Sequence, residues 1–192
     1  MLLEVRGLRK SFGALRATDG VDLEVQEGET LPAMGPNGAG KTTLIGQLAS
    51  NLRPDAGAIR FAGEDITRLR APQRALKGLA RSFQITSVFP EFSALENVAL
   101  AVQAHAGHSF RFWRVAMKDP ALLQPAREML RQVNLEARES ALAANLSHGE
   151  HRQLEVAMAL AGKPRLLLLD EPMAGMGIEE SQRMIGLLGT LK

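Results

Sequence analysis

The sequence contains no cysteine among its 192 residues, and no run of eighteen apolar residues occurs in it. The first absence excludes disulfides, thiolate metal sites and cysteine nucleophiles, and it suits a reducing compartment. The second means that we expect no helix long enough to cross a bilayer. The opening MLLEVRGLRK places Glu4, Arg6, Arg9 and Lys10 where a signal peptide needs an apolar run. We therefore expect a soluble, cytoplasmic domain.

An excess of charge of one sign is also missing, because 23 basic residues face 21 acidic ones and the formal net charge is +2. This balance gives little support to a nucleic-acid partner. The segment FRFWR at 110–114 interleaves aromatics with arginines, as single-strand binders do, but we favour a solvated insertion with a packed Trp113. His105 and His108 have no third ligand at a metal spacing, so we expect them to be surface residues.

The patterning predicts one α/β domain, as the length and the 45% hydrophobic content allow. Glycines suggest that residues 2–31 form short strands broken by turns. Ser93 and Glu96 form a capping box that predicts a helix start, and LLLLD is typical of a strand buried on both faces. The other elements expected are a helix at 41–49, a strand at 58–63, a helix at 126–133 and an amphipathic helix at 179–191. We predict that mainly helical residues 88–160 are inserted between two mixed α/β pieces, 1–87 and 161–192.

A glycine-rich segment, GPNGAGKT at 35–42, matches the pattern G-x-x-x-x-G-K-[ST] in full. Glycines let the backbone wrap closely around a phosphate, and the helix that follows points its positive end at the same anion. Lys41 would contact the β- and γ-phosphates and the Thr42 hydroxyl would ligate Mg²⁺. Pro32 lacks the N–H that an interior strand before this loop would need. The predicted nucleotide-binding residues are Gly35, Pro36, Asn37, Gly38, Ala39, Gly40, Lys41, Thr42 and Thr43.

Two acidic residues, Asp170 and Glu171, end the leucine-rich strand. Ligands of open α/β sheets bind at the carboxyl ends of strands, and an Asp at this place holds Mg²⁺ in P-loop NTPases. Glu171 is placed to reach an attacking water as general base. Alone, the pair would fit a solvated acidic turn before Pro172 equally well. With the phosphate loop upstream, we predict that Asp170 binds Mg²⁺ and that Glu171 and Lys41 are catalytic.

The segment LSHGEHRQLEVAMAL at 146–160 predicts another helix start. Ser147 is a good N-cap, and Glu150 three residues later completes a capping box. The N-terminus of a helix favours anions. Taken alone, LSHGE indicates no more than a capping box.

In this order, GPNGAGKTT, Gln84 in RSFQ, LSHGE and LLLLDEP closely resemble the motifs of the nucleotide-binding subunit of ABC transporters. The resemblance implies a P-loop NTPase (RecA-like) core with an N-terminal antiparallel β subdomain and an inserted α-helical subdomain that carries LSHGE. It also implies that two copies, or one copy and a paralogous subunit, dock head to tail. Each ATP would then lie between the phosphate loop of one copy and Ser147 and Gly149 of the other.

The same resemblance assigns further positions. Phe12 in KSFG would stack on adenine, although an isolated Phe is more often a core residue. Gln84 would act in catalysis and metal binding by linking Mg²⁺ and the attacking water to the permease; without the resemblance it would be an ordinary surface group. Residues 88–160 would receive a coupling helix of the permease, and 174–177 would form the dimer-crossing loop.

LSHGE, RSFQIT and PMAGM particularly resemble the ATPase subunits of branched-chain amino-acid importers. His148 replaces the first of two usual glycines and Glu150 replaces a glutamine. A side chain at position 148 can point away, so we expect function to survive. The family places a further strand and a switch histidine after the last helix, but no histidine follows His151. We therefore expect either a fragment truncated at its C-terminus or a protein that itself lacks this histidine.

We expect an ATPase subunit that energises an ABC importer from the inner face of the cell membrane, as a peripheral protein. Its partners would be transmembrane permease subunits and, indirectly, a substrate-binding protein. The alternative is an ATP-dependent dimerising module with little hydrolysis, because the switch histidine is missing. A soluble ABC protein acting on ribosomes or DNA would need paired ATPase domains or a long coiled coil, for which the helical segment is too short.

Overall fold

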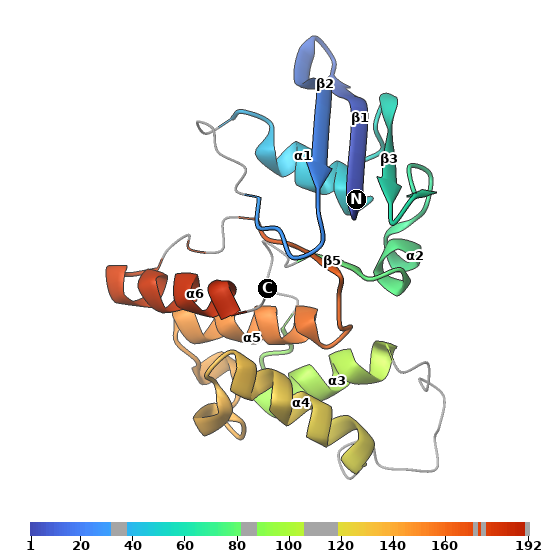
Figure 1. Cartoon of the computed structure of the whole chain (residues 1–192). Coiled ribbons are helices and arrows are strands. Elements are labelled where there is room, and N and C mark those ends of the chain that lie inside the picture. Colours follow the sequence, from blue (N-terminus) through green and yellow to red (C-terminus); the bar gives the residue numbers. More distant parts are fainter. Residues whose placement is uncertain (32–37, 82–87, 106–118, 171–172, 174–175, 191–192) are drawn as a thin grey trace. The chain divides into compact units, whose positions relative to one another are not determined.

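The computed structural model describes residues 1–31, 38–81, 88–105, 119–170, 173 and 176–190. The chain divides into two compact units, Met1–Leu79 and Ala80–Leu191. The strands in blue and teal in Figure 1 belong to the first unit, and the four helices from α3 to α6 belong to the second. Among the described residues, no helix is long and apolar enough to cross a membrane.

The first unit is built on a four-stranded sheet in the order β2-β1-β3-β4, in which each neighbouring pair is antiparallel. The strands are β1 (Leu3–Phe12), β2 (Leu15–Val25), β3 (Ala56–Phe61) and β4 (Glu64–Asp65). The expectation of several short strands over residues 2–31 is wrong, since this segment forms two long ones. Gly7 and Gly20 lie within these strands at positive φ, and the β1–β2 register shifts across Gly7. These glycines therefore bend the strands without ending them.

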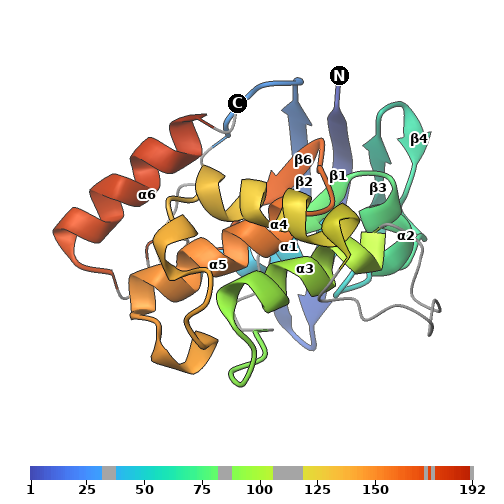
Figure 2. The same cartoon turned by 90° about the horizontal axis from the view of Figure 1, so that it is seen from below.

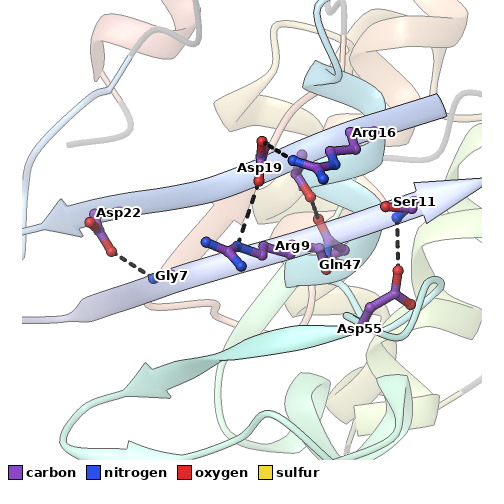
Figure 3. A network of polar contacts seen from close by, with 9 residues as sticks. Gly7, Arg9, Ser11, Arg16, Asp19, Asp22, Gln47 and Asp55 are labelled. Carbon is purple, nitrogen blue, oxygen red and sulfur yellow. Dashed lines mark hydrogen bonds and ion pairs between the residues drawn. The ribbon is translucent and has the colours of Figure 1, made fainter. Parts of the chain in front are cut away.

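Two helices complete this unit, α1 (Lys41–Leu48) and α2 (Ala71–Leu76). The predicted helix after the phosphate loop is thus confirmed. Gln47 of α1 is fully buried, accepts a hydrogen bond from the Thr18 hydroxyl and donates to the Arg9 carbonyl oxygen, 3.0 and 3.2 Å away. Figure 3 shows Gln47 close to β1 and β2. These contacts fix α1 against the sheet.

Arg74 of α2 lies at the C-terminal end of α1. Its guanidinium is buried and donates to the carbonyl oxygens of Gln47 and Leu48, at 2.7 and 2.5 Å. It also donates to the carbonyl oxygens of Leu69 and Thr67, at 3.1 and 3.0 Å. Burial lowers the pKa of Arg74 to about 10, so the group stays charged at neutral pH. A cation is therefore placed at the negative end of the helix that begins at Lys41.

The second unit is mainly helical, with α3 (Ala94–His105), α4 (Pro120–Gln132), α5 (His148–Leu160) and α6 (Ile178–Thr190). Figure 2 gives a second view of these helices. The capping boxes expected at Ser93 and Ser147 are both present. The apolar faces of the helices form one core, which includes Val98, Ala126, Leu130, Leu154, Ala157, Met184 and Leu187.

Two expectations in this region need correction. Helix α4 begins at Pro120, not at Ala126, because the Asp119 carboxylate caps it and Pro125 is accommodated inside it. The leucine-rich strand is only β6 (Leu166–Leu168), paired with β5 (Leu79–Arg81). Its leucines are half-buried in the described part of the chain, where the apolar sequence predicted full burial.

Candidate nucleotide-binding site

The described end of the phosphate loop fits closely against β2. Gly40 is the N-cap of α1 at a φ of 82°, and a Cβ at this position would lie 2.1 Å from the carbonyl oxygen of Ala17. Only glycine combines this φ with this approach. The helix then begins with Lys41, half-buried, and Thr42, exposed, and no acidic residue lies in its first turn. The positive end of α1 is therefore not neutralised by its own side chains.

Several predicted residues of this loop fall outside the described residues, namely Pro32, Gly35, Pro36 and Asn37. Gly38 and Ala39 are described and exposed, and Gly38 also has a positive φ of 84°. Thr43 is half-buried in the first turn of α1. The loop sequence thus meets the helix through two glycines that adopt left-handed backbone conformations.

Phe12 ends β1 as an exposed residue, with 48% of its surface accessible. The alternative of a core phenylalanine is therefore wrong. The Lys10 ammonium lies 5.7 Å from the ring centroid, and it forms an ion pair of 2.7 Å with Asp55. The hydrogen bond from Lys10, followed by that from the Ser11 N–H, lowers the pKa of Asp55. The aromatic ring thus belongs to a charged, ordered end of the sheet.

The start of α5 carries the LSHGE residues. The Ser147 Oγ accepts the Glu150 N–H at 3.2 Å, and the Ser147 N–H donates to a Glu150 carboxylate oxygen at 2.7 Å. A hydroxyl that accepts a hydrogen bond keeps its own proton to donate, so Ser147 remains able to bind an anion. His148 is exposed, as expected from the departure at this position. Arg138 pairs with the Glu150 carboxylate at 3.1 Å and offsets its negative charge.

A pocket of about 260 Å³ lies beside this helix start, and its lining residues are Ser147, Gly149, Glu150, Gln153, Met176, Glu180 and Met184. Gly149 is buried, and a Cβ there would lie 2.7 Å from the Glu180 carboxylate. The same carboxylate accepts the Gly177 N–H at 3.3 Å, just before α6. Sequence reasoning missed Glu180, and its place near the start of the last helix was the only signal for it.

Asp170 is buried after β6, where it pairs with Arg81 of β5 at 3.2 Å. Sequence reasoning missed Arg81, which lies far away along the chain. Glu171 and Gln84 fall outside the described residues, as do Pro172 and residues 174–175. His105 is exposed, as predicted, while His108 and the FRFWR segment are also outside the described residues.

The residues predicted to bind Mg²⁺ offer hydroxyl and carboxylate oxygens, which are the ligands that this ion prefers. The described part of the chain contains no group of three or more His, Cys, Asp or Glu side chains that could hold a metal ion. Mg²⁺ is usually held by one or two carboxylates together with substrate phosphates.

The sequence matches the family model described as ABC transporter over residues 18–174. It is 37% identical, over its full length, to the high-affinity branched-chain amino acid transport ATP-binding protein BraF of Pseudomonas aeruginosa, of which it covers 77%. It is 33% identical over the same extent to the LivG protein of Escherichia coli, which has the same description. The structure is similar to the ADP conformation of an ATP-binding cassette of an ABC transporter, with a TM-score of 0.86 and 26% identity. That match covers 99% of this chain and 76% of the solved one.

The chain belongs to the ABC transporter family. It is an ATPase of this family, and the α/β fold expected from the motifs is confirmed. Among its relatives, it is similar over its full length to subunits for branched-chain amino acids. A sulfate/thiosulfate import ATP-binding protein of Bordetella pertussis is also 37% identical, over 92% of this chain and 47% of that protein. The cassette sequence is thus shared between relatives with different cargoes.

Proposed function

We propose that this chain energises an importer of branched-chain or other amino acids by binding and hydrolysing Mg²⁺-ATP between two copies. The similarity to BraF and LivG over the full chain supports this cargo class. Within this proposal the chain is a peripheral subunit on the cytoplasmic face of the membrane. A substrate-binding protein would interact with the transporter only through the permease.

The observation that carries the proposal is a pair of helix starts suited to anions, one on each compact unit. Helix α1 starts at Lys41 after the phosphate loop, and α5 starts after Ser147, whose hydroxyl accepts the Glu150 N–H and can donate a hydrogen bond of its own. One triphosphate needs donors on several sides, and a head-to-tail dimer supplies both helix starts to it. The two helix starts of a single chain then bind different nucleotides.

The residues predicted to contact the phosphates, the metal ion and the attacking water have distinct roles in this site. Lys41 and the loop N–H groups bind the β- and γ-phosphates, while Thr42 and Asp170 hold the metal ion. Mg²⁺ supplies charge neutralisation of the phosphate oxygens. Glu171 accepts a proton from the attacking water, and Gln84 connects that water with the permease. Arg81 keeps the Asp170 carboxylate oriented.

The permease is proposed to dock on the turn that precedes α3. Phe89 and Phe92 stack with ring centroids 5.2 Å apart, and both are more than 40% exposed. The buried Asn97 amide holds this turn by donating to the carbonyl oxygens of Phe89, Phe92 and Ser93. A fixed pair of exposed aromatic rings suits an apolar partner surface.

The shared site is tested by mixing two inactive variants, Lys41→Ala and Ser147→Arg. A mixed dimer of the head-to-tail kind has one site with both defects and one intact site. Equal amounts should therefore recover about a quarter of the wild-type ATPase activity, because half of the dimers are mixed. Ser93→Arg, which alters the same capping chemistry in α3, is the control that keeps the nucleotide site. No recovery on mixing would contradict a site formed by two chains.

A second measurement addresses the general base. Glu171→Gln removes the proton acceptor and leaves the phosphate contacts, so the variant should retain ATP and accumulate as a dimer in light scattering. A variant that stays monomeric at saturating ATP would contradict the proposal.

A further inference from the structure

The Phe12 ring has one face covered by a cation. Lys10 and Phe12 are two residues apart in β1, and residues at this spacing point to the same face of a strand. The Lys10 ammonium lies 5.7 Å from the ring centroid, a distance typical of a cation–π contact. Since nearly half of Phe12 remains exposed, a flat ligand can still reach the ring.

Asp55 ties the end of β1 in place. Its Oδ1 accepts from the Lys10 ammonium at 2.7 Å, and its Oδ2 accepts the Ser11 N–H at 2.8 Å. The Asp55 N–H in turn donates to the carbonyl oxygen of Arg9 at 2.9 Å. Figure 3 shows Asp55 reaching Ser11 from the neighbouring turn. A single residue therefore contacts the three residues that precede Phe12.

We propose that Asp55 is a positioning residue for adenine binding, which holds Lys10 against one face of Phe12 so that the other face meets the base. This inference rests on the proposed binding of ATP and on the prediction from the sequence that Phe12 stacks on adenine. Among the described residues, the hydrogen bonds and the ion pair of Asp55 all lie at the end of β1. Asp55 should therefore affect recognition of the base and not of the triphosphate.

A purely structural role would give a different result. The Asp55 side chain is 48% exposed, and exposed ion pairs contribute little to folding stability. Asp22 provides a matched control in the same sheet, because its carboxylate accepts the Gly7 N–H at 2.6 Å. Figure 3 shows this contact in the middle of β1, on the other side of Arg9 from Ser11. Both aspartates thus bind a backbone N–H of β1, but only Asp55 also holds Lys10.

The experiment compares binding of ATP and of inorganic tripolyphosphate to the full chain by calorimetric titration. Asp55→Ala should weaken ATP binding about three- to tenfold, with tripolyphosphate binding unchanged, since part of the stacking energy is lost. Asp22→Ala should change neither affinity. Phe12→Ala sets the upper limit for the loss of ATP affinity. Unfolding midpoints of the two aspartate variants give the control for stability.

The outcomes separate the inference from the function on which it rests. If Phe12→Ala weakens ATP binding and Asp55→Ala does not, the inference is overturned and the adenine site stands. If Phe12→Ala has no effect, the adenine role itself fails. Equal weakening of both ligands by Asp55→Ala would assign it a structural role and overturn the inference. If Asp55→Ala fails to fold, Asp55→Asn decides, because it keeps an acceptor for Ser11 and removes the charge that holds Lys10.

Discussion

Replacing Arg74 with methionine tests whether α1 depends on the cation at its end. Arg74 is 1% exposed, and its guanidinium donates to four carbonyl oxygens, two of which belong to the last residues of α1. Methionine fills most of the volume but leaves these acceptors without a donor. Hydrogen bonds from charged groups contribute about 1.5–3 kcal/mol each. The net loss of stability is smaller than their sum, because the variant no longer has the desolvation cost of a buried charge.

We therefore expect Arg74→Met to lower the free energy of unfolding by about 3–5 kcal/mol, because each buried carbonyl left without a donor costs about 1–3 kcal/mol and the charge that is no longer buried offsets part of this sum. Since whole proteins are stable by only about 5–15 kcal/mol, this loss is large. It corresponds to a fall of about 6–20 °C in the melting temperature for a chain of this size. The loss should appear in the transition of the first unit if the two units unfold separately.

Urea unfolding followed by circular dichroism measures this loss, with Arg68→Met as the matched control. Arg68 lies six residues away and is exposed, so its replacement should change stability by less than about 0.5 kcal/mol. Arg74→Lys should fall between them, since one ammonium keeps the charge but cannot reach four carbonyl oxygens. If Arg74→Met and Arg68→Met have equal stability, the hydrogen bonds of Arg74 do not stabilise α1.

Two further predictions concern the anion sites. Gly40→Ala should weaken ATP binding at least about tenfold in calorimetric titration, because its Cβ would meet the Ala17 carbonyl; Gly38→Ala, strained but in open space, should lose less. Glu150→Gln should strengthen ATP-driven dimerisation several-fold and Arg138→Gln should weaken it, with the double variant near wild type in light scattering. Identical changes in all three variants would refute the charge balance.

Local signals in the sequence predicted the helix starts well. The capping boxes at Ser93 and Ser147 form as expected, because each involves residues only three apart. The start of α4 was predicted too late, because Asp119 caps the helix and Pro120 begins it, while Pro125 is accommodated inside it. The glycines within residues 2–31 led to the wrong expectation of short strands, because glycine is typical both of turns and of bulges inside a strand.

Contacts between distant segments could not be predicted from the sequence. Arg81 and Asp170 pair across 89 positions, and the Glu180 carboxylate lies against the place where Gly149 lacks a side chain. Neither pairing has a local pattern, because each depends on which elements become neighbours in the fold. The motifs therefore predict which residues face the nucleotide, and the fold was needed to find Arg81 and Glu180 beside two of them.

Strand β1 lies between β2 and β3, so its two edges pair with segments that are synthesised at different times. The hairpin with β2 is complete once Val25 has emerged, but the other edge waits for Ala56–Phe61. During that interval a nascent chain offers an unpaired strand to any neighbour with a free edge. Slow translation between these two points would therefore lengthen the period in which this chain is open to misassembly.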